Sequence, residues 1–207
     1  MASFDYFFTS ASPFAYLGHS ALMDMARKHD AQVAFRPVRL ADVFEVSGAL
    51  ALAKRPPVRQ SYRFLELQRV AEMRGLPINI QPKFFPVDPA LADLSIIAII
   101  ESGEDPSAFM TGVFEAVWSR EEDIADEANI RAFLTESGFD ADRMLEFARS
   151  DRAAAIRAKN TSDAIAAGVV GAPAYVLNGE PFWGQDRIEY LDQALKSGRE
   201  PYQAPKI

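Results

Sequence analysis

The N-terminal part of the chain alternates between strand and helix in its pattern of apolar and polar positions. Residues 4–9 (FDYFFT) are rich in aromatic side chains and predict a strand. From Pro13 to about Lys28, apolar residues recur every three or four positions, which predicts an amphipathic helix. Residues 32–38 alternate again and predict a second strand. Two strands joined by one crossover helix predict a parallel pair with a right-handed connection.

The middle of the chain has mostly helical patterns. We expect helices over the ranges 59–74, 91–101, 107–118, 129–137, 141–150 and 151–167. Gly75 and Pro77 form a stop signal after the first of these helices. Asp140 is placed to cap the helix that follows it. Residues 78–89 contain Pro82, Pro86 and Pro89, so they predict an ordered loop.

The C-terminal part returns to a mixed pattern. Residues 174–177 predict a strand, and the Asn-Gly dipeptide that follows is the strongest hairpin signal in the chain. The partner strand is expected at residues 181–183. A final helix is expected from Asp186 to Leu195, because Asp186 and Glu189 have the spacing of a capping box.

The order of these elements is β-α-β, then a helical block, then α-β-β-α. This order predicts an α/β protein, a thioredoxin fold with an inserted α-helical domain. We assign residues 1–41 and 160–207 to a discontinuous thioredoxin-like domain, and residues 42–159 to the inserted helical domain.

Composition narrows the range of partners and locations. The 207 residues are 49% hydrophobic and 25% charged, which is ordinary for a globular protein with a substantial core. A net charge of -7 and a pI near 4.9 argue against a nucleic-acid partner. No apolar run is long enough to span a bilayer, and the N-terminus opens in a strand rather than in a signal peptide. We therefore expect no membrane partner and a cytoplasmic location.

Cysteine is absent from the chain. This excludes disulfides, thiolate metal sites and dithiol exchange by the chain itself. His19 and His29 are the only histidines, so we expect no histidine-based metal site. Both are expected at the surface or at helix caps.

Ser12 stands at the mouth of the first predicted helix, directly before Pro13. A helix N-terminus carries unpaired N–H groups and a partial positive charge, so it stabilises an anion placed there. One interpretation of Ser12 is an ordinary N-cap with proline at the next position. The other is a hydroxyl that stabilises a thiolate. Since the chain has no thiol, that thiolate has to come from another molecule.

Four segments, in order along the chain, carry a resemblance to a known family. They are residues 12–17 (SPFAYL), residues 62–77 (Y…ELQR…GLP), residues 170–173 (VGAP) and residues 182–187 (FWGQDR). The first stands where thioredoxin relatives carry Cys-x-x-Cys. On these segments the chain resembles the kappa-class glutathione transferases and bacterial 2-hydroxychromene-2-carboxylate isomerases of the DsbA-like thioredoxin superfamily.

The resemblance implies that glutathione is the cofactor, with its sulfur beside Ser12 as the catalytic residue. It implies a cis peptide bond before Pro173, where the backbone of Ala172 would pair with glutathione, although a trans turn proline is the ordinary alternative. The γ-glutamyl group is implied to bind at Trp183, Gly184, Gln185 and Asp186. The alternative for Asp186, taken on its own, is the N-cap of the last helix.

Contacts to the substrate are implied in the helical insert, at Lys54, Arg55 and Phe84. The alternative for the two basic residues is solvated surface charge. Phe44 stands where the pattern of the isomerases has a lysine, and Phe84 or Phe85 stands where it has a tyrosine. These departures leave the particular substrate open.

The function implied by the resemblance is a glutathione-dependent isomerase. Its substrate would be 2-hydroxychromene-2-carboxylate or a similar conjugated acid from aromatic compound catabolism. Reversible addition of the thiolate would turn a double bond into a rotatable single bond. A kappa-class-like glutathione transferase and a non-catalytic thioredoxin-fold binding protein remain as alternatives. Relatives are commonly dimers, so a homodimer is expected.

Overall fold

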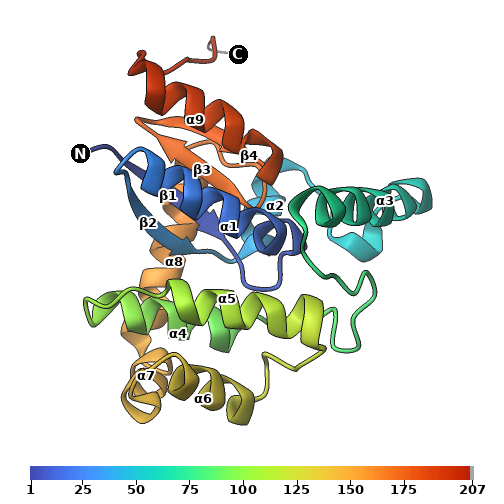
Figure 1. Cartoon of the computed structure of the whole chain (residues 1–207), viewed down its shortest axis with the longest axis vertical. Helices are drawn as coiled ribbons and strands as arrows, with labels where there is room; N and C mark the ends of the chain where they lie inside the picture. The colour runs from blue at the N-terminus through green and yellow to red at the C-terminus, as the bar shows by residue number, and fades with distance from the viewer. Residues whose placement is uncertain (206–207) are drawn as a thin grey trace.

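The computed structural model describes residues 1–205, which contain a four-stranded mixed sheet (Figure 1). The strands are β1 (Ser3–Phe8), β2 (Gln32–Pro37), β3 (Ala174–Leu177) and β4 (Glu180–Trp183), in the order β2-β1-β3-β4. β1 pairs parallel with β2, from Ser3↔Gln32 to Phe8↔Pro37. β3 pairs antiparallel with both β1 and β4. The predicted parallel pair and the predicted hairpin are both confirmed.

Nine α-helices and three short helical turns complete residues 1–205. The α-helices are α1 (Pro13–Lys28), α2 (Leu40–Ser47), α3 (Pro57–Arg74), α4 (Ala90–Glu101), α5 (Ser107–Glu115), α6 (Glu127–Glu136), α7 (Ala141–Ala148), α8 (Asp151–Ala166) and α9 (Ile188–Ser197). The turns are η1 (Leu52–Lys54), η2 (Ala116–Arg120) and η3 (Gln185–Arg187). Residues 78–89 form neither helix nor strand, as predicted.

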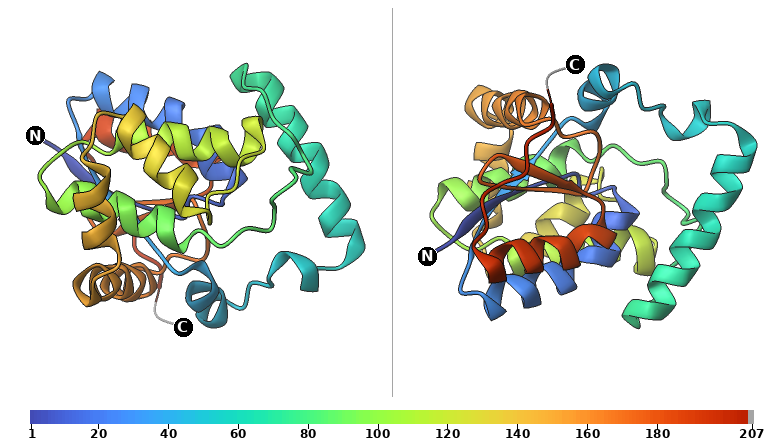
Figure 2. Two further views of the ribbon diagram at one scale, coloured as in Figure 1. Left: turned by 90° about the horizontal axis from the view of Figure 1, so that it is seen from below. Right: turned by 90° about the horizontal axis from the view of Figure 1, so that it is seen from above.

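The helices cover both faces of the sheet. α1 and α9 lie on one face and α8 lies on the other, as Figure 2 shows from above. α4, α5, α6 and α7 form a block below the sheet in the view of Figure 1, and α3 stands to one side. The block contacts the sheet part through α4 against β2 and through α5 against α1. This arrangement is the α/β thioredoxin fold with a helical insert that the element order predicted.

The alternation of side chains along β1 divides the interior into two cores. Phe4, Tyr6 and Phe8 are buried in the larger core, which also takes in α1 and helices of the insert. Phe7 points to the opposite face and packs with Val38 in a smaller core under α8. Period-two alternation is what a strand buried on both faces requires.

The two ends of α8 lie on either side of the proposed domain boundary. Residues 159 and 160 are adjacent positions inside this one helix. The thioredoxin-like part and the insert therefore share a continuous element, and α8 connects them without a linker.

One of the local predictions at helix ends is wrong. α9 begins at Ile188, and its N-cap residue, Arg187, makes no side-chain cap hydrogen bond. The carboxylate of Asp186 pairs with the Arg187 guanidinium at 2.6 Å instead of capping the helix. The helix expected over residues 107–118 is present, although its last part, Ala116–Arg120, is the π-helical turn η2. Capping by Asp140 is confirmed, since its carboxylate accepts from the Arg143 N–H at 3.2 Å.

His19 is buried rather than at the surface, which corrects the prediction. Its side chain lies on the face of α1 that enters the larger core, where Tyr6 and Phe114 flank the ring. Burial lowers the pKa of His19 to about 4, and the charge of Asp105 partly opposes that shift. Neither ring nitrogen has a hydrogen-bond partner within residues 1–205. His29 does lie at a helix cap, and its Nε2 is 2.6 Å from an Asp192 oxygen.

No helix within residues 1–205 combines the length and the apolar character needed to cross a membrane.

The low pKa of His19 predicts a loss of stability in acid. The unfolded chain, with a histidine pKa near 6.5, takes up the proton before the folded chain does. The stability that neutral His19 preserves is therefore complete above pH 6.5 and is lost as the pH falls toward 4, by up to about 3 kcal/mol. His19→Leu should flatten this part of the profile, measured by urea unfolding at several pH values. Parallel profiles for the two proteins would contradict the assignment.

Candidate functional site

A cavity of about 470 Å³ opens between the thioredoxin-like part and the insert. Ser12, Pro13, Phe14 and Ala172 line it from the thioredoxin-like side. The opposite walls come from α2, η1, α3 and the loop before α4. The cavity therefore lies where the first helix begins, and both parts of the chain contribute to it.

Ser12 is the N-cap of α1, with Pro13 as the first helical residue. Its Oγ accepts a hydrogen bond from the Ala15 N–H at 3.2 Å, and the residue is 7% exposed. The Ser12 hydroxyl donates to no acceptor within residues 1–205. A hydroxyl can accept and donate at the same time. The capping interpretation is thus confirmed, and the proton of the hydroxyl stays available to an anion in the cavity.

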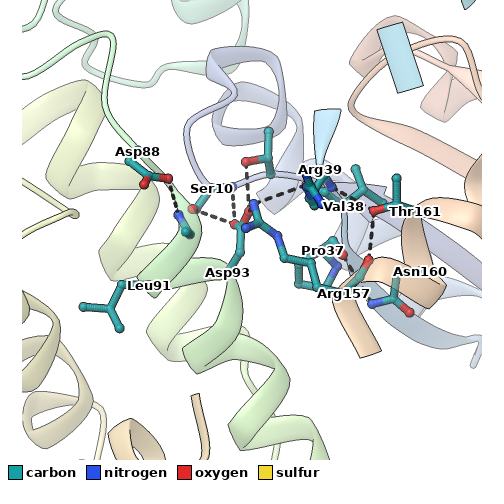
Figure 3. A network of polar contacts seen from close by, with 12 residues as sticks. Ser10, Pro37, Val38, Arg39, Asp88, Leu91, Asp93, Arg157, Asn160 and Thr161 are labelled. Atoms are coloured by element: carbon teal, nitrogen blue, oxygen red, sulfur yellow. Dashed lines mark hydrogen bonds and ion pairs between the residues drawn. The ribbon is translucent and has the colours of Figure 1, made fainter. Parts of the chain in front are cut away.

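The loop before Ser12 is held from below by a buried carboxylate (Figure 3). Asp93, on α4, accepts from the Thr9 Oγ1 at 3.0 Å, and from the Ser10 N–H and Oγ at 2.8 and 2.7 Å. Arg157, on α8, donates to the same carboxylate at 2.6 Å. Asp93 is fully buried, which raises its pKa, while the charge of Arg157 and the hydrogen bonds from the loop oppose the rise.

Further contacts from α8 fix the end of β2 beside the cavity. Thr161 accepts from the Arg39 N–H at 2.9 Å, and the Asn160 side chain donates to the Pro37 carbonyl at 3.3 Å (Figure 3). Sequence reasoning missed this network. Its only visible signal was Asp93, a single carboxylate inside an otherwise apolar helical run.

The peptide bond between Ala172 and Pro173 is cis, which confirms the prediction. Ala172 lines the cavity, and the paired register of β3 begins after it, at Ala174. The peptide groups of Ala172 therefore lie outside the sheet pairing. The Pro173 carbonyl accepts from the Gly184 N–H at 2.9 Å, which ties the cis-proline loop to the segment after β4.

The residues predicted for the γ-glutamyl group lie next to the cis-proline loop but outside the cavity lining. Trp183 is half exposed and covers Gly171, where a Cβ would come within 2.6 Å of the indole Nε1. Gln185 is buried and accepts from Arg74 at 3.3 Å. Asp186 is exposed and paired with Arg187. Trp183 and Asp186 are the exposed members of this group, which is joined to the cis-proline loop by the Gly184–Pro173 hydrogen bond.

Among the residues suggested for the substrate, Arg55 lines the cavity, while Lys54 and Phe84 do not. Lys54 is exposed. Phe85, and not the predicted Phe84, lines the cavity. The complete set of charged residues in the lining is Arg39, Arg55, Arg63, Arg157 and Asp88. The cavity is thus cationic although the chain as a whole is acidic.

Comparison with known proteins agrees with this architecture. A family model described as a DSBA-like thioredoxin domain matches residues 4–196. The 2-hydroxychromene-2-carboxylate isomerase of Sphingobium xenophagum is 29% identical over 193 residues, covering 92% of this chain and 96% of that protein. The isomerase of the same name from Pseudomonas putida is 29% identical over 195 residues, covering 92% and 93%.

Solved structures are similar to this chain over most of its length. A selenomethionine structure of 2-hydroxychromene-2-carboxylate isomerase has a TM-score of 0.82 and 25% identity, covering 94% of this chain and 95% of its own. The cytosolic disulfide reductase DsbM from Pseudomonas aeruginosa, solved with GSH, has a TM-score of 0.65 and 15% identity, covering 94% and 99%. The similarity to the isomerases that was inferred from four short segments is confirmed over nearly the whole chain.

The Asp93–Arg157 pair predicts a strong energetic coupling. Asp93→Asn leaves the Arg157 guanidinium without its counter-charge in a buried place, and should cost about 3–5 kcal/mol of unfolding free energy. Arg157→Met leaves the carboxylate uncompensated in the same way. The double variant should lose much less than the sum of the two single losses, measured by urea unfolding. Additive losses would show that the two charges do not depend on each other.

Proposed function

The chain belongs to the DSBA-like thioredoxin domain family. From its similarity to the isomerases and from the site described above, we propose that it is a glutathione-dependent isomerase of a conjugated aromatic acid. The proposed substrate is 2-hydroxychromene-2-carboxylate or a close analogue. This compound appears in the names of the similar proteins. The absence of cysteine excludes the alternative activity of this family, disulfide exchange through the chain's own thiols.

The observation that carries the proposal is the position of Ser12. Its hydroxyl lies in the cavity wall, at the N-terminus of a 16-residue helix, and has a proton to donate. Hydrogen bonding and the helix dipole both favour the charged form of a thiol placed there, so they lower its pKa. A serine oxygen cannot form a disulfide, so the thiol is activated without being trapped.

The groups around Ser12 suit the rest of glutathione. The peptide groups of Ala172, which lie outside the sheet pairing within residues 1–205, can pair with the cysteinyl backbone as an added strand would. The Gly184–Pro173 hydrogen bond keeps the exposed Trp183 and Asp186 at a fixed distance from that loop. The Asp186 carboxylate would exchange its present partner, Arg187, for the ammonium of the γ-glutamyl group.

When bound, glutathione would supply a thiolate nucleophile that makes a double bond of the substrate rotatable. The protein's own residues have three tasks in that reaction. Ser12 holds the negative charge of the sulfur before and after the chemical step. The apolar side chains of Phe14 and Phe44 in the lining offer a surface to a planar substrate, and the arginines of the lining attract its acidic group.

A direct assay tests the proposal against its two alternatives. Isomerisation of 2-hydroxychromene-2-carboxylate should depend on added glutathione, and calorimetric titration should detect glutathione binding. Conjugation of chlorodinitrobenzene without isomerisation would instead identify a glutathione transferase. No heat of binding at millimolar glutathione would favour a non-catalytic binding protein.

Ser12→Ala tests the role of the hydroxyl. Removing a hydrogen bond to a charged group should raise the pKa of the bound glutathione thiol by about 1–2 units, because such bonds contribute about 1.5–3 kcal/mol. The shift is read from the ultraviolet absorbance of the thiolate as a function of pH.

Ser150→Ala is the matched control for this experiment. Ser150 caps α8 in the same way, since its Oγ accepts from the Ala153 N–H at 3.2 Å, and it lies outside the cavity lining. Its hydroxyl differs from that of Ser12 in also donating to the Phe147 carbonyl at 2.6 Å. Both variants should lose about 1 kcal/mol of stability from the cap. Only Ser12→Ala should change the thiolate titration, and an equal titration in all three proteins would refute the role of Ser12.

A further inference from the structure

Arg63 is a buried cation without a counter-ion. It lies on α3, is 8% exposed and lines the cavity. It makes no ion pair and no hydrogen bond to any of residues 1–205, and its Nη2 is buried without a partner. Burying a charge costs free energy unless a partner compensates it. A position like this reduces stability in the free protein, so it calls for a ligand that supplies the missing charge.

Two aromatic rings hold the Arg63 guanidinium in place. Its Cζ lies 5.4 Å from the centre of the Phe85 ring and 5.7 Å from that of Trp118. The two rings are 4.8 Å apart, and Trp118 is fully buried on the π-helical turn η2. Ring faces attract a cation but leave its N–H groups without acceptors. The guanidinium is thereby oriented while its donors remain unused.

A second guanidinium faces the same cavity. Arg55 donates from its Nε to the Leu50 carbonyl at 2.8 Å and has no ion pair within residues 1–205. Burial, followed by the charge of Arg55, lowers the pKa of Arg63 to about 10. Arg63 thus stays charged at neutral pH, and the two cations repel each other.

The other two arginines of the lining already have a carboxylate partner. Arg39 is paired with Asp42 at 3.4 Å, and Arg157 is paired with Asp93 at 2.6 Å. Asp88, the one carboxylate of the lining, accepts from the Ala90 N–H at 2.9 Å and is exposed. The uncompensated positive charge of the cavity therefore lies at Arg63 and Arg55.

We propose that Arg63, assisted by Arg55, binds the carboxylate of a planar aromatic acid in this cavity. A guanidinium presents parallel N–H groups that match the two oxygens of a carboxylate. The ring of the acid would lie against Phe85 and Phe44, which line the same cavity. This inference deepens the proposed function by assigning the acidic end of the substrate. Binding of the acid is measured in the absence of glutathione, and binding of glutathione is measured separately, so either idea can fail while the other stands.

The test compares cinnamate with cinnamamide, an uncharged ligand of the same shape, by calorimetric titration of the full chain. The wild-type protein should bind cinnamate more tightly by at least about tenfold, the effect of one hydrogen-bonded charge. Arg63→Met should lose that preference and keep the affinity for cinnamamide. Arg63→Lys, which keeps the charge without the fork, should retain part of the preference. Arg69→Met, an exposed arginine of the same helix paired with Glu66, is the control and should behave as wild type.

The melting temperature separates binding from a structural role. Because Arg63→Met removes an uncompensated buried charge, it should unfold at a temperature no lower than that of the wild type. Equal affinities of the wild type for the acid and the amide would overturn the proposal. So would a lower melting temperature with equal loss of both ligands, or weakened glutathione binding with unchanged cinnamate binding, which would assign Arg63 to a carboxylate of glutathione.

Discussion

The buried carboxylate of Asp93 is the constraint on which the site depends. It accepts hydrogen bonds from Thr9 and Ser10, and it forms an ion pair with Arg157. Since Asp93 lies on α4 and Arg157 on α8, these contacts join the end of β1 to both helices. A charge at this depth is tolerated only when its acceptor positions are filled. The loop, the insert and the sheet part are therefore locked together at one point, directly before Ser12 and the start of α1.

The arginines of the cavity divide into two groups with different consequences. Arg157 is compensated by Asp93, and it contributes to the rigidity of the loop. Arg63 is compensated by nothing within residues 1–205, and it rests on two aromatic rings. The first arrangement stabilises the fold. The second holds a charge ready for a ligand at a cost in stability, which is typical of preorganised binding sites.

Local sequence patterns predicted an element correctly where interactions between nearby residues determine it. Helical periodicity gave the bounds of α1, Asn-Gly gave the β3–β4 hairpin, and the Ser12-Pro13 dipeptide gave a capped helix start. Two predictions failed although the competing signal is local. Asp186 was expected to cap the last helix, but its carboxylate pairs with a guanidinium. His19 was expected outside, although its spacing from Ala15 and Leu22 placed it on the apolar face of α1.

The sequence by itself determined the order of the elements, the fold class and the serine at the mouth of the first helix. These follow from interactions between residues a few positions apart, which periodicity and capping rules describe. The tertiary structure alone decided which charges face the cavity. Lys54 and Arg55 are neighbours in sequence but only Arg55 lines it, and Arg63 joins it from the next helix. That choice depends on how α2 packs against α8 and how α3 packs against α1, which no local pattern encodes.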